Sequence, residues 1–263
     1  EELPTETVAE GVSELESDDA IALLEDLDRS EQEEILEAMP AIERSALRRS
    51  LDYPDKSAGR LMQTTLVAVP PLWTAGQALD HLREGDQEEL PDSFFEVFVV
   101  DPGHRLLGNV FLDKLARTPR STPLQDIMQD RRRVKVSDDE EEVARMFERY
   151  NIVSAPVVDE ADRLVGVITI DDIVDVIQEA ADEDIKALGG VSRTEELTDP
   201  IFSVARGRFV WLFVNLLTAF LASSVLGIFQ GELQKMVALA ILAPIVASQG
   251  GNAATQTMTV AVR

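Results

Sequence analysis

A stretch that occurs twice decides the fold of this chain. The first copy reads Phe98-Val-Val-Asp-Pro-Gly-His-Arg-Leu-Leu-Gly-Asn-Val-Phe-Leu-Asp113. The second reads Pro156-Val-Val-Asp-Glu-Ala-Asp-Arg-Leu-Val-Gly-Val-Ile-Thr-Ile-Asp171, at a constant offset of 58 residues from Phe98 to Pro156. Val-Val-Asp, Arg-Leu and a glycine recur in phase. The repeat predicts two copies of one structural unit.

Each copy has the pattern of a small α/β unit. We expect a short strand, a helix (residues 75–84 and 140–150), two strands joined by an acidic or glycine-containing turn, and a second helix. A repeat of about 60 residues that occurs only twice is too short for a solenoid. The sequence therefore predicts two subdomains packed face to face.

The first 53 residues have a helical pattern instead. Ile35, Leu36, Met39 and Ile42 recur at helical spacing, and Ser30 followed by Glu33 predicts a capping box. Seventeen acidic and four basic side chains lie in this segment. Two interpretations stay open: a solvated helical face, or a surface that binds cations or another domain.

Composition excludes several classes of protein. The 263 residues carry a formal charge of −25, with no cysteine and two histidines. A disulfide scaffold, a cysteine nucleophile and thiolate metal sites are excluded. So negative a chain argues against nucleic acid as a partner and favours cations. No P-loop or Gly-x-Ser-x-Gly motif occurs, so we expect no enzyme, and the acidic residues 1–11 predict no signal peptide.

A run of carboxylates follows the second copy. Seven acids and no base lie between residues 171 and 184: Asp171, Asp172, Asp175, Glu179, Asp182, Glu183 and Asp184. Spacings of three and four place Asp172, Asp175, Glu179 and Glu183 on one stripe of a helix. Oxygen ligands without sulfur or imidazole suit hard ions such as Mg²⁺ or Ca²⁺, and no calcium-loop motif is present. We expect loose, water-rich Mg²⁺ sites; the alternative is a solvated amphipathic helix.

Two uncharged stretches, residues 209–229 and 236–262, are each long enough to cross a bilayer. Arg206 and Arg208 precede the first and Arg263 follows the second, which predicts that both ends face the cytoplasm. We expect a multi-pass protein of the inner (plasma) membrane with a cytoplasmic N-terminus. Polar residues interrupt the second stretch, and irregular backbone at membrane depth needs protein or water beside it. This predicts a place in a larger bundle, near a polar pathway.

The paired units resemble a CBS-domain pair, the regulatory module of the cystathionine β-synthase type. The second copy contains that family's nucleotide pattern, Gly166-Val-Ile-Thr-Ile-Asp-Asp172, in which the threonine binds phosphate and the aspartate binds ribose. Phe111 and Lys114 stand at the corresponding positions of the first copy. The expected nucleotide-binding residues are Thr169, Asp171, Asp172, Pro156 and Arg131, the last as part of an arginine run that could neutralise phosphates.

The C-terminal stretch Ala243-Pro-Ile-Val-Ala-Ser-Gln-Gly-Gly-Asn-Ala-Ala-Thr-Gln-Thr-Met-Thr-Val-Ala-Val-Arg263 is similar to the second-span signature of MgtE-family magnesium channels. Residues 51–62 are similar to that family's junction between its helical N domain and its CBS pair. The resemblance implies a homodimeric Mg²⁺ channel gated by cytosolic Mg²⁺. It implies pore-proximal roles for Gly250, Gly251 and Asn252, and metal-binding roles for Asp139, Glu141, Asp172, Asp175, Glu183 and Asp184. Glu179 joins the metal set from the stripe described above.

The expected fold class is therefore multidomain: an all-α N-terminal helical domain, an α/β CBS-domain pair, an acidic linker helix and α-helical transmembrane segments. The expected boundaries are 1–53 for the end of the N domain, 54–120 and 121–178 for the CBS units, 171–190 for the linker or plug helix, and 205–263 for two spans of an incomplete channel domain.

Two functions of different classes compete. The favoured one is Mg²⁺ transport, with the cytosolic regions sensing Mg²⁺ and closing the pore by negative feedback. The alternative is a membrane-anchored CBS-pair sensor of adenine nucleotides that regulates a partner membrane protein. Expected ligands and partners are Mg²⁺, an adenine nucleotide such as ATP, membrane lipid and a second copy of the chain, with no nucleic acid.

Overall fold

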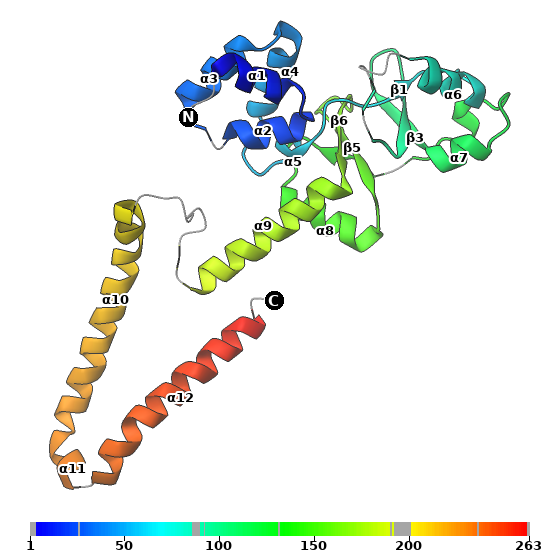
Figure 1. Cartoon of the computed structure of the whole chain (residues 1–263). Helices are drawn as coiled ribbons and strands as arrows, with labels where there is room; N and C mark the ends of the chain where they lie inside the picture. Colours follow the sequence, from blue (N-terminus) through cyan, green and yellow to red (C-terminus); the bar gives the residue numbers. More distant parts are fainter. Residues whose placement is uncertain are drawn as a thin grey trace. The chain divides into compact units, whose positions relative to one another are not determined.

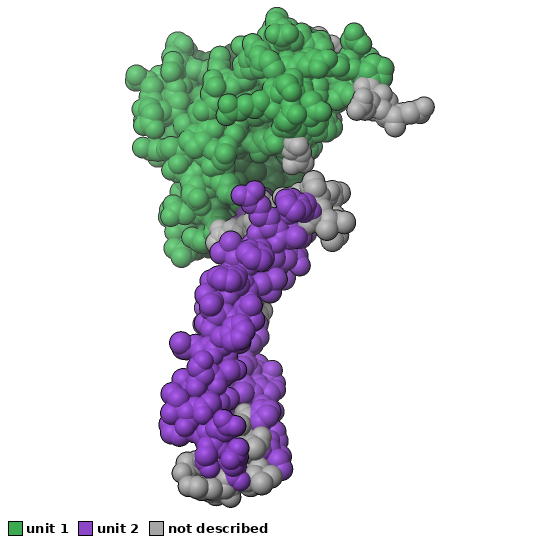
Figure 2. Space-filling model, turned by 90° about the vertical axis from the view of Figure 1, so that its left-hand side faces the viewer, with its two compact units in different colours: residues 1–177 green, residues 178–263 purple. Residues whose placement is uncertain are grey.

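The computed structural model describes residues 4–25, 27–85, 90–91, 93–130, 132–189, 191, 201–235 and 237–261 (Figure 1). The chain forms two compact units, residues 1–177 and 178–263, which are described one at a time (Figure 2).

The first unit begins with four helices, as the helical pattern predicted. They are α1 (Thr5–Ser13), α2 (Ser17–Glu25), α3 (Arg29–Ala38) and α4 (Ala41–Leu51). Their shared core contains Val12, Ile21, Leu24, Leu36 and Leu47. The apolar faces of four short helices are thus buried against one another, which is how helices of this length become stable.

Two local predictions in this region were wrong. The capping box of α3 is formed by Asp28 and Glu31, not by Ser30 and Glu33. The Asp28 carboxylate accepts hydrogen bonds from the backbone N–H groups of Ser30 (2.9 Å) and Glu31 (3.1 Å). Ile42 is 87% exposed, because α3 ends before Pro40 and Ile42 belongs to the next helix, outside the predicted face.

The repeat forms two similar α/β halves after the short helix α5 (Ala58–Leu61). The first contains β1 (Ala68–Val69), α6 (Ala75–Glu84), β2 (Glu96–Val100), β3 (Leu106–Phe111) and α7 (Leu112–Arg117). The second contains the 3₁₀ helix η1 (Leu124–Asp126), β4 (Val134–Lys135), α8 (Glu140–Tyr150), β5 (Ser154–Val158), β6 (Leu164–Thr169) and α9 (Ile170–Leu188). In each half the middle strand pairs parallel with the first and antiparallel with the third. The helices predicted at 75–84 and 140–150 are confirmed.

The two halves interlock through their backbones. Gln63, which precedes the first half, exchanges hydrogen bonds of 2.8 and 2.9 Å with Val167 in β6. Gln129, which precedes the second, does the same with Asn109 in β3, at 2.9 and 3.0 Å. Each half therefore lends a segment to the sheet of the other, which confirms the predicted packing of the two copies.

This crossing explains the repeated glycine. A Cβ atom on Gly166 would lie 2.8 Å from the Gln63 carbonyl oxygen, and one on Gly108 would lie 2.7 Å from that of Gln129. The repeated aspartate has a local role, because Asp101 accepts hydrogen bonds from the N–H groups two and four residues later, and Asp159 does the same. The repeat thus preserves one turn and one backbone crossing.

The second unit contains the end of α9, then α10 (Ile201–Ile228), α11 (Gln230–Lys235) and α12 (Val237–Ala261). Within the described part of the chain, one helix is long and apolar enough to cross a membrane, Val204–Ile228, with a mean hydropathy of 2.0. The second predicted span is helical as α12, with Pro244 inside it. Its insertion into a membrane stays a prediction.

Replacing Gly166 with alanine tests the crossing. The new methyl group would push against a backbone carbonyl that cannot swing aside, so we expect a loss of about 1–3 kcal/mol in the free energy of unfolding. Gly11→Ala is the matched control, since nothing lies within 4 Å of its Cβ position and alanine favours a helix. Urea unfolding, followed by Trp73 fluorescence in a Trp211→Phe background, measures both. Equal stability of the two variants would contradict the crossing.

Candidate functional site

The N-terminal helices dock on the paired α/β halves at the start of α2. The Gln63 side-chain amide donates to Glu16 Oε2 at 2.6 Å, and the Thr64 backbone N–H donates to Ser17 Oγ at 2.8 Å. Both acceptors lie at or just before the first residue of α2. These contacts bring the first turn of α2 to the first turn of α9.

On the α9 side, Asp172 is held in place by Thr169. Its carboxylate accepts hydrogen bonds from the Thr169 backbone N–H (2.8 Å) and hydroxyl (3.0 Å), and the residue is only 8% exposed. A threonine followed three residues later by an acid is a helix-capping pattern. Residues 169–172, the last four of the nucleotide-like motif, therefore also form the start of α9. The same Thr-x-x-Asp spacing could have predicted this helix start from the sequence.

On the α2 side, Asp18 meets Asp172. Burial, together with a hydrogen bond between the two carboxyl groups, raises the pKa of Asp172 to about 8. The Asp18 Oδ1 atom is buried and has no hydrogen-bond partner. A hydrogen bond between two carboxyl groups requires a proton, so the pair holds one proton near neutral pH, as expected for buried like charges.

More carboxylates surround this pair. Burial raises the pKa of Asp19, and the charges of Asp18, Asp175 and Asp171 raise it further. Five carboxyl groups, from two helices about 150 residues apart in the sequence, thus lie close enough to repel one another. The site can be neutralised by protons or by a cation with oxygen ligands.

The predicted metal residues do not form a closed cage. Among the described residues, no three His, Asp or Glu side chains are arranged to hold a metal ion. Asp172 and Asp175 lie at the contact with α2, and Glu179, Glu183 and Asp184 lie further along α9. Asp139 caps α8 by accepting from the N–H groups of Glu141 (3.0 Å) and Glu142 (3.2 Å), and Glu141 pairs with Arg145 at 2.8 Å.

Sequence reasoning missed Asp18 and Asp19. The acidic pattern of the N-terminal segment left two interpretations open, a solvated helical face or a surface for cations or another domain, and it singled out no residue. The available signal was their place in the first turn of a helix, but the partner of that turn depends on docking contacts that no local pattern contains. Asp18 and Asp19 therefore came to light only in the folded chain.

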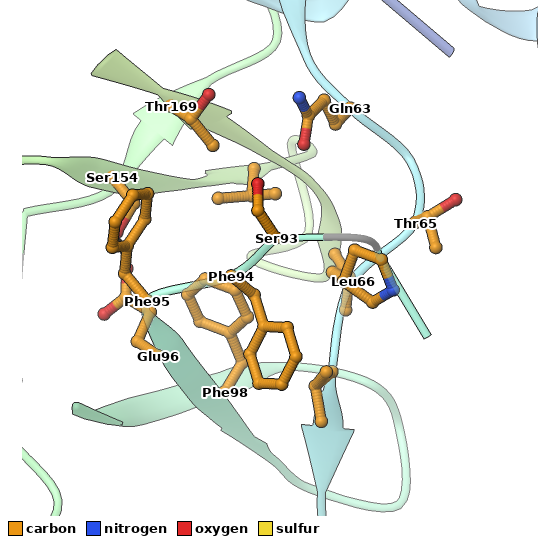
Figure 3. Close-up of a pocket in the computed structure, with 13 residues that line it drawn as sticks. Gln63, Thr65, Leu66, Ser93, Phe94, Phe95, Glu96, Phe98, Ser154 and Thr169 are labelled. Atoms are coloured by element: carbon orange, nitrogen blue, oxygen red, sulfur yellow. The ribbon is translucent and has the colours of Figure 1, made fainter. Parts of the chain in front are cut away.

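The predicted nucleotide residues are not gathered around a ligand-sized space. Thr169 lines a cavity of about 20 Å³ with Ser154 and three phenylalanines (Figure 3). Such a volume holds about one water molecule. The buried Glu96 is part of its wall and accepts a hydrogen bond from Ser154 Oγ at 2.7 Å.

The other predicted nucleotide residues have different surroundings. Asp171 accepts a hydrogen bond from the Thr169 hydroxyl, Asp172 faces Asp18, and Pro156 pairs with Val167 in the sheet. Arg131 lies outside the described residues. The Arg132 guanidinium stacks on the Tyr150 ring at 3.9 Å.

Gly250, Gly251 and Asn252, which are predicted to lie near the pore, are exposed residues of α12. The Gly251 carbonyl accepts a hydrogen bond from the Thr255 hydroxyl at 3.0 Å. Their role stays a prediction.

Two segments of the chain match models of known protein families. Residues 1–56 match the MgtE intracellular N domain, and residues 124–179 match the CBS domain. The chain is 32% identical to the magnesium transporter MgtE of Bacillus subtilis (strain 168), over 96% of this chain and 56% of that protein. It spans about half the length of the curated relatives it matches.

Two solved structures are similar to about two thirds of this chain. The soluble part of a magnesium transporter has a TM-score of 0.64 and 32% identity, covering 68% of this chain and 70% of that one. The cytosolic domain of the Mg²⁺ channel MgtE in complex with ATP has a TM-score of 0.60 and 29% identity, covering 66% and 76%.

The raised pKa of Asp172 gives docking a pH dependence. The docked chain holds a proton that a free carboxyl, with a pKa of about 3.9, releases, so docking is strongest at low pH. It is lost as the pH rises through the docked pKa of about 8, by at most about tenfold per pH unit because one proton is involved.

The chain has no cysteine, so spin labels on Ser45→Cys in α4 and on Ser121→Cys, between α7 and η1, can report docking as one distance. Without divalent ions, we expect the docked distance to be lost progressively between about pH 4 and pH 8, the interval between the free and the docked pKa. Asp172→Asn should remove this pH dependence. A wild-type distance that is constant across that range would contradict the shared proton.

Proposed function

The chain belongs to the MgtE family of magnesium transporters, and we propose that it is the sensing and gate-linked part of a magnesium channel. In this proposal, Mg²⁺ is the transported ion, and it also binds the cytosolic helices and CBS pair, which close the pore as its concentration rises. The curated relatives that this chain matches are magnesium transporters, which motivates the choice of ion.

The observation that carries the proposal is the contact between Asp18 and Asp172. Two unit charges about 4 Å apart repel by about 4 kcal/mol at an effective dielectric constant of 20. At low Mg²⁺ this repulsion loosens α2 from α9 whenever the proton is lost. At high Mg²⁺ a hydrated divalent ion replaces the proton and bridges the two helices. The N-terminal helices then stay docked against α9.

Several weak sites together can drive such a switch. Moving an equilibrium from 1:99 to 99:1 takes about 5.5 kcal/mol of differential binding. Asp18 and Asp19 join Asp172 and Asp175 in the first proposed site. Asp139 with Glu141, and Glu179 with Glu183 and Asp184, are proposed to bind further ions as the acidic faces approach each other. Closure by rising Mg²⁺ makes the feedback negative.

The remaining parts of the proposal concern the membrane and the assembly. Homologues of this chain are membrane proteins, and we place its N-terminus in the cytoplasm, since Arg206 and Arg208 lie in the first two turns of α10. The proposed mechanism needs no catalysis. We further propose a homodimer in which a second copy covers the apolar stripe of α9, where Ile170, Val174, Ile177 and Ile185 are 37–66% exposed.

An adenine nucleotide is proposed as a modulator rather than as the main signal. One similar structure is an MgtE cytosolic domain in complex with ATP. In this chain the cavity of about 20 Å³ beside Thr169 is far smaller than the hundreds of Å³ that a nucleotide requires. Nucleotide binding there would therefore need this cavity to widen. The alternative of a nucleotide sensor that regulates another membrane protein is therefore not favoured.

Limited proteolysis of the full chain in detergent tests the proposed function. Trypsin cleavage after Lys56, at the exposed junction between α4 and α5, should slow steeply with millimolar Mg²⁺. In the double variant Asp18→Asn, Asp172→Asn, cleavage should be slow already without Mg²⁺, because the repulsion is gone. Asp126→Asn, an exposed acid in η1, is the control and should respond as the wild type does.

The comparison salt is NaCl at matched ionic strength. Equal protection by NaCl, or an unchanged Mg²⁺ response in the double variant, would contradict Mg²⁺ sensing at this contact.

A further inference from the structure

The junction helix α5 is fixed to the second CBS half. Its first two residues are buried, and the Ala58 and Gly59 backbone N–H groups donate to the carbonyls of Asp138 (2.8 Å) and Val136 (3.0 Å). A Cβ atom on Gly59 would lie 2.6 Å from the Tyr53 ring, so that ring packs directly on the helix. Residues of α5 therefore move with the CBS pair.

From this fixed helix, Arg60 reaches the N-terminal helices. Its Nη1 donates to the carbonyl of Leu51, the last residue of α4, at 2.6 Å. Its buried Nε lies 2.6 Å from Glu25 Oε1, at the last residue of α2, as an ion pair rather than an aligned hydrogen bond. Its Nη2 pairs with Asp55 in the linker. The side chain is only 15% exposed.

Arginine suits this position because its planar fork holds several acceptors at once in fixed directions. Here the fork joins the ends of two helices and the linker to a helix of the CBS pair. A lysine has one point-like ammonium group on a flexible chain, and it cannot maintain the same three contacts.

The contacts of α2 lie at opposite ends. Glu25, at its C-terminal end, is attracted by Arg60, whereas Asp18 and Asp19, in its first turn, face the carboxylates of α9. The nine residues of α2 span about 13 Å, so the two contacts act on one short rigid rod. The attraction between Glu25 and Arg60 therefore keeps α2 in place against the repulsion between its first turn and the carboxylates of α9.

We propose that Arg60 is a positioning residue that keeps α2 seated so that Asp18 and Asp19 stay opposite Asp172 and Asp175. This inference rests on the proposed Mg²⁺ sensing and specifies how its threshold is set. Without Arg60, more bound Mg²⁺ is needed to overcome the acidic repulsion, because the opposing attraction is missing. The guanidinium thus sets the Mg²⁺ concentration at which docking occurs.

The spin-label pair at Ser45→Cys and Ser121→Cys, measured in the full chain over a Mg²⁺ series, tests this. Arg60→Gln should raise the Mg²⁺ midpoint of the docked distance about fivefold or more, within the usual range of coupling between sites. Arg60→Lys should give an intermediate midpoint. Arg49→Gln, which removes an exposed charge from α4, should leave the midpoint at the wild-type value.

The outcomes separate the two claims. If the wild type responds to Mg²⁺ and Arg60→Gln has the midpoint of Arg49→Gln, the positioning role is overturned while Mg²⁺ sensing stands. If the wild type does not respond to Mg²⁺, Mg²⁺ sensing fails, and the role of Arg60 is judged from the label distance without Mg²⁺. A longer distance in Arg60→Gln, but not in Arg49→Gln, supports the positioning role. Equal distances in the two variants overturn it. Circular dichroism of each variant, with Arg60→Lys as the milder change, shows that the helices remain folded.

Discussion

The contact between two carboxyl groups, Asp18 of α2 and Asp172 of α9, is the constraint on which the rest of the first unit depends. Buried like charges cannot approach unless a proton or a cation lies between them, and the pKa of Asp172, raised to about 8, expresses this requirement. Contacts at both ends of α2 hold the two helices together despite this repulsion. Gln63 and Thr64 bind the start of α2, and Arg60 binds its end.

The repeated fold supplies the rigid side of this contact. Because each half of the CBS pair lends a segment to the other, β6 is fixed at the point where α9 begins. Thr169 ends that strand and orients Asp172. A small change in charge at this point therefore acts on a rigid element, because α9 continues as one helix from Ile170 to Leu188.

Much of this architecture could be predicted because it is local or repeated. Helices α6 and α8 have the predicted bounds, and the recurring aspartate lies in the predicted turn, whereas the close approach at the recurring glycine is seen only in the folded chain. Capping of α3 was misplaced, since Ser30 and Asp28 both suit a cap and only the folded chain shows which one begins the helix. Asp18 and Arg60 could not be predicted as a site, because their partners are set by docking between distant segments. Thr169 and Asp172 fit two motifs at once, and spacing alone does not choose between them.

Proton release on metal binding tests the central claim most directly. If a divalent ion takes the place of the proton shared by Asp18 and Asp172, adding Mg²⁺ to the unbuffered chain near pH 7 should release about one proton per chain, because metal ligands must be deprotonated. A pH-stat titration measures this, and Asp172→Asn should release none. Mg²⁺ binding with no proton release in the wild type would contradict the account.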